Sequence, residues 1–261
     1  MRIVAVTNQK GGSGKTTTAV NVAAALAEAG QRVLLIDLDP QASASAWCGV
    51  TPEADHGRGL FDVFAGEKVD VADLAHVTAV PNLSAVPASP WLVNVEKAVA
   101  GDVGAETLLR RALARLPETW DWVFLDCPPS LGFLSLSALV ACRDVLVPVE
   151  AHTMALAGLA ALRQTIDRVR ERLNPALAIL AILACRVDTR TNLSRDVVAR
   201  LRSHEWSGPL MLDTVIRESV RLAEAPSFHQ PITVYAPASS GADDYRAAAR
   251  ELLARTKRSR R

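Results

Sequence analysis

The sequence contains few of the residues that build disulfide-linked, metal-binding or membrane-spanning proteins. Its 261 residues include four cysteines, at positions 48, 127, 142 and 185, and no C-x-x-C pair. Zinc sites and disulfide frameworks use more compact cysteine groups, so neither is favoured, and we expect four reduced, mostly buried thiols. Aromatic residues make up 5% of the chain. No apolar run reaches the roughly 18 residues of a membrane-spanning helix.

A strong charge of either sign is also missing, because the formal net charge is +1. The distribution is uneven, however: residues 1–185 carry 15 Lys or Arg against 19 Asp or Glu, and residues 186–261 carry 14 against 9. A basic C-terminal third is typical of a nucleic-acid surface. It is equally typical of a solvated surface with a basic tail, since residues 255–261 supply five of these positive charges. Charge alone favours neither interpretation.

Length and hydrophobic content predict one enzyme-sized domain. Hydrophobic residues make up 49% of the chain, enough for a substantial core. We expect a single domain over residues 1–255, followed by a basic tail over residues 256–261. The first predicted strand begins at residue 3, which leaves no room for a signal peptide, so a cytoplasmic location is expected.

A glycine-rich segment near the start carries the strongest functional signal. Residues 8–18 read N-Q-K-G-G-S-G-K-T-T-T, between an apolar run at residues 3–6 and an Ala-rich stretch with helical character. Glycines allow main-chain amides to close around a phosphate, and the N-terminus of the following helix adds positive potential. Lys15 can then reach the outer phosphates, and the Thr16 hydroxyl can complete the shell of a Mg²⁺ ion. We therefore predict a site for a nucleoside triphosphate, with ATP and Mg²⁺ as cofactors.

Apolar runs alternate with helical patterns along the chain, which is typical of a parallel sheet covered on both faces. The predicted fold is α/β, a doubly wound, mostly parallel sheet of the P-loop NTPase type. Strands are expected at residues 3–7, 32–37, 83–86, 120–126, 144–149 and 177–185. Helices are expected at residues 16–29, 106–116, 153–173, 192–203 and 243–255.

Three aspartates lie at or just after the carboxyl ends of two of these strands. Because ligands of open parallel sheets bind at the carboxyl ends of the strands, Asp37, Asp39 and Asp126 should converge on the phosphates. Asp126 follows the apolar run at residues 122–125 and has the form of a Walker B acid. The predicted metal-site residues are Thr16, Asp37 and Asp126.

The glycine loop departs from the usual G-x-x-x-x-G-K-[ST] pattern in an informative way. Gln9 stands where that pattern has glycine, and Lys10 precedes Lys15 by five residues. This loop resembles the deviant Walker A loop of the ParA/MinD family of ATPases. Further segments resemble ParA proteins over most of residues 1–255: D-L-D-P-Q at 37–41, D-C-P-P-S-L-G at 126–132, R-L-A-E-A-P-S at 221–227 and G-A-D-D-Y at 241–245.

The resemblance implies a partitioning ATPase. Such a protein would bind ATP, form a sandwich homodimer, coat double-stranded DNA without sequence preference and hydrolyse ATP slowly. Its usual partner would be a ParB-like centromere-binding protein that stimulates hydrolysis, and it would be associated with the nucleoid. The cargo, whether a plasmid, a chromosome or another body, is not identified by the sequence.

Residue roles follow from the resemblance. The nucleotide is expected to contact Lys10, Gly11, Gly12, Ser13, Gly14, Lys15, Thr16 and Thr17. Lys10 would reach phosphates in the partner's site across the dimer interface, and Asp39 would position the attacking water. Lys10, Lys15 and Asp39 are therefore the predicted catalytic residues, with Asp37 supporting the water shell of the metal. Base contacts are expected from the segment after the strand at 177–185 and from the loop around Pro226.

The predicted DNA contacts come from the basic C-terminal third. Residues 216–221 read I-R-E-S-V-R where many relatives have I-P-R-N-V-R, so proline and asparagine are lost while Arg217 and Arg221 are present. These two arginines, with Arg190 and Arg195, are the candidates for the DNA surface. Structural ion pairs with Glu218 and Glu224 are the alternative.

Three other functions on the same fold are considered. A membrane-cycling protein of the MinD type would need an amphipathic C-terminal helix, and residues 256–261 have charge without apolar anchors, so no membrane partner is expected. A ParA-like positioner of a non-DNA cargo remains possible on sequence grounds. A metabolic or metal-cluster ATPase is disfavoured by the missing C-x-x-C pair and the scattered cysteines.

Overall fold

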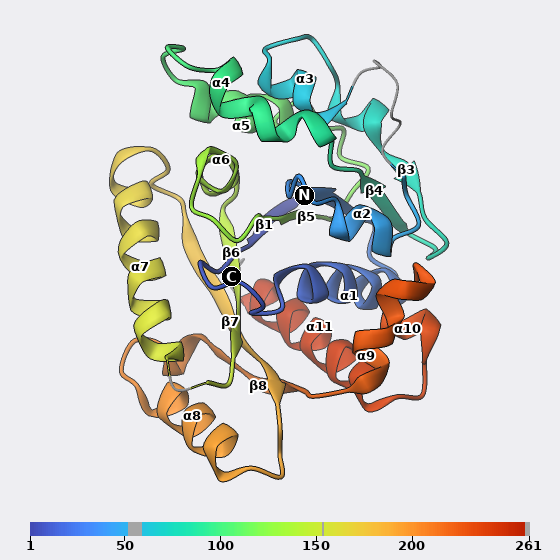
Figure 1. Cartoon of the computed structure of the whole chain (residues 1–261), viewed down its shortest axis with the longest axis vertical. Helices are drawn as coiled ribbons and strands as arrows, with labels where there is room; N and C mark the ends of the chain where they lie inside the picture. Colours follow the sequence, from blue (N-terminus) through green and yellow to red (C-terminus); the bar gives the residue numbers. More distant parts are fainter. Residues whose placement is uncertain (52–58, 153, 259–261) are drawn as a thin grey trace.

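An eight-stranded sheet forms the centre of the molecule in the computed structural model, which describes residues 1–51, 59–152 and 154–258 (Figure 1). The strand order is β3-β4-β2-β5-β1-β6-β7-β8, and every neighbouring pair is parallel except β3 with β4. The strands are β1 (Arg2–Val6), β2 (Val33–Asp37), β3 (His76–Val77), β4 (Leu83–Val86), β5 (Trp122–Asp126), β6 (Asp144–Glu150), β7 (Ala178–Val187) and β8 (Met211–Arg217). The predicted mostly parallel sheet is confirmed.

Helices cover both faces of this sheet. The α-helices are α1 (Lys15–Glu28), α2 (Ser43–Trp47), α3 (Leu60–Phe64), α4 (Val95–Ala98), α5 (Leu108–Leu113), α6 (Phe133–Ala141), α7 (Ala155–Arg172), α8 (Asn192–Ser203), α9 (Val220–Glu224), α10 (Ile232–Tyr235) and α11 (Ser240–Arg258). Short 3₁₀ turns are η1 (Val71–Leu74), η2 (Pro90–Asn94), η3 (Ala105–Thr107), η4 (Gly208–Leu210) and η5 (Ala225–Phe228).

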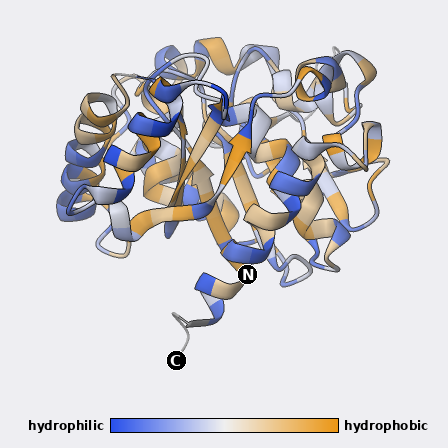
Figure 2. Ribbon diagram, turned by 90° about the horizontal axis from the view of Figure 1, so that it is seen from below, coloured by the Kyte–Doolittle hydropathy of each residue, from blue (hydrophilic) through white to orange (hydrophobic). Residues whose placement is uncertain are grey.

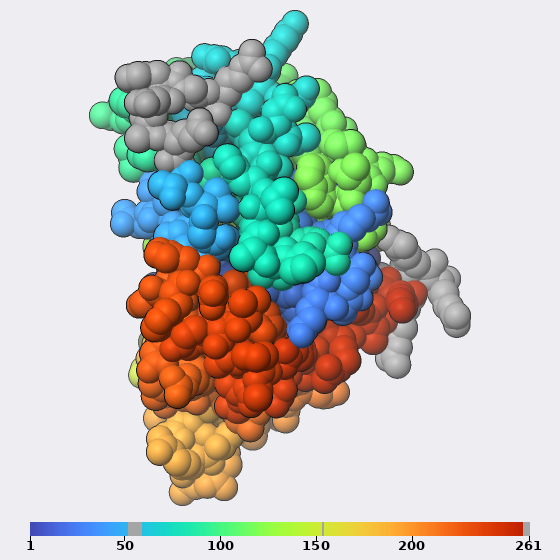
Figure 3. Space-filling model, turned by 90° about the vertical axis from the view of Figure 1, so that its right-hand side faces the viewer, coloured from blue at the N-terminus to red at the C-terminus, as the bar shows by residue number. Residues whose placement is uncertain are grey.

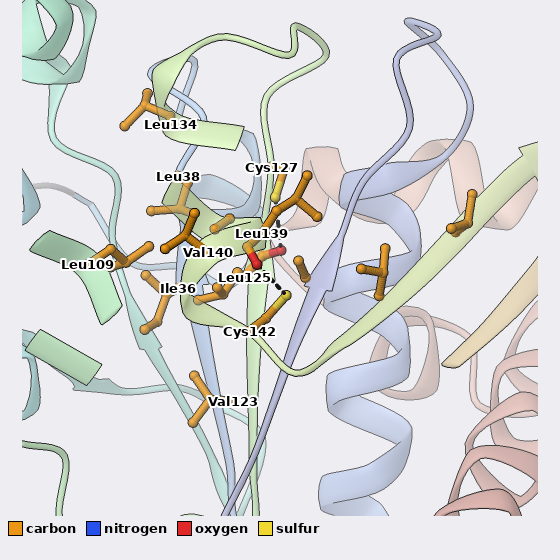
Figure 4. Packing of buried hydrophobic residues seen from close by; sticks show 14 of the residues in the cluster. Ile36, Leu38, Leu109, Val123, Leu125, Cys127, Leu134, Leu139, Val140 and Cys142 are labelled. Atoms are coloured by element: carbon orange, nitrogen blue, oxygen red, sulfur yellow. Dashed lines mark hydrogen bonds between the residues drawn. The ribbon is translucent and has the colours of Figure 1, made fainter. Parts of the chain in front are cut away.

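The hydrophobic core is divided by the sheet into two clusters. One cluster joins the sheet to α3, α5, α6, α7 and α8, and the other joins it to α1, α2 and α11. Figure 2 shows apolar strands enclosed between helices with more polar outer turns. In the first cluster, Leu109 of α5 and Val140 of α6 lie beside Ile36 and Leu125 of the sheet (Figure 4). Burial on both faces explains why the central strands read as continuous apolar runs.

The four cysteines occupy this interior. All of them are buried and free. Burial raises the pKa of Cys48, Cys142 and Cys185 to about 12, so these thiols stay protonated. The expectation of mostly buried thiols is confirmed.

Several elements lie outside the sequence prediction. Strand β8 carries polar residues at Asp213 and Thr214, and so it lacks the continuous apolar run used to predict its neighbours. Helix α6 is apolar on nearly all sides and short, which leaves no helical period to detect. The last helix is longer than predicted, because α11 continues through Arg258. Residues 259–261 of the predicted tail and Thr153 of the predicted helix at 153–173 lie outside the described residues.

The C-terminal segment around residues 229–232 is hydrogen-bonded to α1 and α2, the helices that follow β1 and β2. Trp47 Nε1 donates to the carbonyl oxygen of Gln230 at 2.7 Å, and His229 Nδ1 donates to that of Ala46 at 2.7 Å. The buried Asn21 of α1 accepts from the amide of Ile232 at 2.7 Å and donates to the carbonyl of Thr17 at 2.7 Å. Figure 3 shows the C-terminal segment packed directly against the α2 region.

No helix in the described ranges is both long and apolar enough to cross a membrane.

Candidate functional site

The glycine loop joins β1 to α1 in the geometry that an anion site needs. Gly12 and Gly14 have φ values of 73° and 85°, in the left-handed region that favours glycine. Gly14 is the N-cap of α1, whose first residue is Lys15, and no side chain caps this helix end. The first-turn amides of α1 are therefore available to an anion.

Two lysines and a serine of the loop lie in different environments. Lys15 is buried, and its Nζ donates to the carbonyl oxygen of Lys10 at 3.1 Å. Burial lowers the pKa of Lys15, while Asp126 and Asp39 act in the opposite direction. The Nζ of Lys10 instead forms an ion pair with Glu150 Oε2 at 2.8 Å. Ser13 is buried and its Oγ has no hydrogen-bond partner in the described structure, so its predicted phosphate contact would come from its main-chain amide.

The three predicted aspartates do converge beside this loop. Parallel pairing places Asp37 of β2 directly opposite Asp126 of β5, and Asp126 in turn opposite Val6, the last residue of β1. Asp37 is satisfied by the chain itself: its Oδ2 accepts from the amide and hydroxyl of Ser45 at 2.8 and 2.7 Å, and its Oδ1 accepts from the amide of Asp39 at 3.0 Å. Burial nevertheless raises the pKa of Asp37 to about 6.

Asp126 differs from Asp37 because neither of its carboxylate oxygens has a hydrogen-bond partner within the described part of the chain. Its side chain is fully buried. Burial, and then the charge of Asp37, raise the pKa of Asp126 well above its ordinary value. A buried, unpaired carboxylate is costly unless a cation compensates it. Together with the neighbouring Thr16 hydroxyl, the oxygen donors present here fit Mg²⁺.

The loop that carries Asp39 contains a strained residue. Ala42, the N-cap of α2, has φ 54° and ψ 31°, a left-handed conformation that costs a residue with a Cβ about 1–2 kcal/mol. Replacing Ala42 by glycine removes part of this cost. The substitution also raises the conformational entropy of the unfolded chain, which offsets some of the gain in stability.

We expect Ala42→Gly to raise the free energy of unfolding by about 0.5 kcal/mol, measured by urea denaturation. Ala46→Gly is the matched control, because Ala46 lies exposed within the same helix, and there glycine should lower stability by about 1 kcal/mol. Equal destabilisation by both substitutions would show that Ala42 is not strained.

A cavity of about 470 Å³ opens beside the loop, large enough for a nucleotide. Its phosphate end is lined by Gly11, Gly12, Gly14, Lys15, Thr16, Thr17 and Asp39. Its other end is lined by Cys185, Arg186, Ile216, Arg217, Glu218, Ser219, Leu222, Ala223 and Tyr245. Arg186, the first residue after the predicted strand at 177–185, lines this cavity although it lies within β7, whereas residues 225–228 around Pro226 do not. Residues 216–219, 222 and 223 line it instead, and they were missed because β8 was not predicted.

The four predicted DNA-contacting arginines all have partners within the chain. Arg190 pairs with Asp188 at 2.9 Å, and Arg221 with Glu224 at 2.9 Å. Arg195 donates to the Asn192 side chain at 3.1 Å. Arg217 forms an ion pair with the largely buried Asp244 at 2.7 Å and also lines the cavity. Arg190 and Arg217 line the same surface pocket. Arg217 also has a structural role, because its main-chain amide donates to Asp244 and so joins β8 to α11.

Comparison with known proteins assigns the family. Residues 1–179 match a family model described as an AAA domain. The chain is 47% identical over 255 residues to the chromosome-partitioning ATPase Soj of Thermus thermophilus, a match covering 98% of this chain and 96% of that protein. It is 40% identical over 254 residues to the chromosome partitioning protein ParA of Myxococcus xanthus, covering 97% and 88%. The chain belongs to the Soj/ParA family of partitioning ATPases.

Solved structures agree with the fold of this Soj/ParA chain. A cobyrinic acid a,c-diamide synthase from Mycobacterium smegmatis, crystallised with an ATP analogue and magnesium, superimposes with a TM-score of 0.84. The two chains share 35% identity, and the match covers 99% of this chain and 97% of that one. The predicted family and fold are thus confirmed.

Proposed function

We propose that this Soj/ParA-family chain is an ATP-dependent DNA-partitioning protein with ATP and Mg²⁺ as cofactors. The proposal rests above all on one observation: a nucleotide-sized cavity whose phosphate end joins Lys15, Asp39 and the glycine loop, next to the unpaired carboxylate of Asp126. A phosphate-binding loop without a nearby carboxylate could bind an anion but would have no means of placing a metal and a water.

The chain's own residues account for most of the chemistry. The loop amides and Lys15 would bind the phosphates, and Thr16 and Asp126 would hold Mg²⁺, which neutralises developing charge on the phosphate oxygens. Asp37, fixed by Ser45, would orient the turn that carries Asp39 and support the metal's water shell. Asp39 would then position the attacking water. A site with one positioning carboxylate and few cations predicts slow turnover.

Nucleotide binding would control assembly. The ion pair of Lys10 with Glu150 is open to solvent, with the Lys10 side chain 46% exposed, so its loss would cost little stability. In an ATP-bound homodimer it would reach the partner's phosphates. The dimer would bind double-stranded DNA without sequence preference, and a ParB-like centromere-binding protein would stimulate hydrolysis. The protein would accordingly be cytoplasmic and associated with the nucleoid, segregating chromosome or plasmid DNA.

The DNA contact can be tested at Arg221. We expect Arg221→Glu to weaken binding of random-sequence duplex DNA in the presence of ATP, and to lower the slope of log affinity against log salt by about one unit, as loss of one phosphate contact predicts. The measurement is fluorescence anisotropy over a series of salt concentrations.

Arg170→Glu is the matched control for this experiment. Arg170 on α7 forms an exposed ion pair with Asp167, three positions earlier, as Arg221 does with Glu224, three positions later. Arg170→Glu therefore changes the net charge by the same amount as Arg221→Glu, but on another surface of the molecule. If both variants keep the wild-type salt slope, Arg221 does not contact DNA.

A further inference from the structure

Arg186 lies at the end of β7 in a backbone conformation that arginine rarely adopts. Its φ is 52°, in the left-handed region, and the pairing of β7 with β8 shifts register between Ala184 and Val187. Irregularities of this kind redirect side chains, and strained residues concentrate where ligands bind. Here the strained residue lines the 470 Å³ cavity, between the glycine loop and the wall formed by β8 and α9.

The guanidinium of Arg186 shares one carboxylate with Lys10. Arg186 Nη1 lies 3.5 Å from Glu150 Oε1, and Lys10 Nζ lies 2.8 Å from Glu150 Oε2. Arg186, which lines the cavity, and Lys10 therefore share a single anion. The Arg186 contact is the longer of the two, and its side chain is 57% exposed, so it is the easier one to break.

Arg186 is also close to the phosphate-binding groups through a chain of contacts. Glu150 binds the side chain of Lys10, and the carbonyl oxygen of Lys10 accepts from Nζ of Lys15. Arg186 and the loop residues Gly11, Gly12 and Lys15 also line the same cavity, so an anion at the glycine loop would share that cavity with the guanidinium. A phosphate group matches guanidinium geometry as a carboxylate does and can accept two parallel hydrogen bonds.

We propose that Arg186 is a nucleotide-binding residue whose guanidinium exchanges Glu150 for a phosphate oxygen of the bound nucleotide. This inference rests on the proposed function, because it requires the cavity to accept ATP. In the ATP-bound monomer, before Lys10 crosses to a partner, the exchange leaves Glu150 paired with Lys10. Arg186 belongs to no phosphate-binding motif, and the sequence predicts only base contacts from the segment that it begins; its conformation and its place in the cavity point to the phosphates instead.

The test compares ligands that differ only in their phosphates. Binding of ATP, ADP and adenosine is measured by calorimetry with Mg²⁺ for the wild type and for Arg186→Asn, since asparagine tolerates the left-handed conformation. The affinity for ATP should fall about tenfold, as for loss of one charge-assisted hydrogen bond, and that for adenosine should not change. Arg186→Lys, which keeps the charge, should lose less than Arg186→Asn.

A second variant reverses the sign of the effect. Glu150→Gln frees both cations and should raise the affinity for ATP several-fold while leaving adenosine unaffected. Unchanged ATP affinity in Arg186→Asn would overturn the proposal, and so would an equal loss for ATP and adenosine, which would place Arg186 on the base. A wild type that binds no ATP at all would instead contradict the proposed function itself.

Discussion

Replacement of Lys15 by alanine should abolish ATP binding, with a loss of affinity of at least about 100-fold. The ammonium of Lys15 is already partly desolvated and donates to a carbonyl of its own loop, so it is positioned before the nucleotide arrives. Its removal takes away the charge-assisted contacts to the phosphates. It also leaves the negative charges of Asp126 and Asp39 uncompensated beside an incoming polyanion.

Two measurements check this expectation. Calorimetry gives the affinity directly, and the thermal stabilisation that ATP confers on the wild type should disappear in Lys15→Ala. Lys97→Ala serves as the control, because Lys97 lies exposed on α4 away from the cavity lining. Micromolar affinity for ATP in Lys15→Ala would remove the loop from its assigned role.

Replacement of Asp39 by alanine should separate ATP binding from hydrolysis. We expect the hydrolysis rate to fall by about 100-fold or more, the usual effect of losing a group that positions or activates a nucleophile. ATP-dependent dimerisation and DNA binding should persist. The structure gives the reason: the loop is fixed by Asp37 and Ser45, whereas the Asp39 side chain accepts one hydrogen bond within the described residues, from the amide of Gln41 at 3.0 Å.

The isosteric Asp39→Asn controls for that hydrogen bond, since its side-chain oxygen can still accept from Gln41. It should be as inactive in phosphate release as Asp39→Ala, while both variants dimerise with ATP in sedimentation experiments. A wild-type rate of hydrolysis in either variant would exclude Asp39 from the reaction. Loss of dimerisation in both would show that Asp39 acts in assembly instead.

Much of the phosphate end of the site could be predicted from sequence, because its signals are local. Glycines at fixed spacing, a lysine before a helix and aspartates at strand ends each depend on short segments. The order of β1, β2 and β5 in a parallel sheet then brings Asp37 and Asp126 together. This convergence requires no knowledge of side-chain packing.

Most of the other end of the cavity could not be predicted in this way. It is built from residues 185–186 and 216–223, which come together only because β7 and β8 are neighbours in the sheet. The polar residues of β8 conceal its strand character, and the positive φ of Arg186 has no signal in the sequence. The internal partners of the four candidate arginines likewise depend on tertiary contacts, as with Arg217 and Asp244.

The hydrogen bonds between α1, α2 and residues 229–232 limit how the protein can be dissected. Truncation before η5 would remove the partners of Trp47 and Asn21 and would uncover the apolar side of α1 that packs on α11. A shortened chain that retained every motif of the first 150 residues would therefore not fold into a minimal nucleotide-binding unit. Separation of function must come from point substitutions on the intact polypeptide.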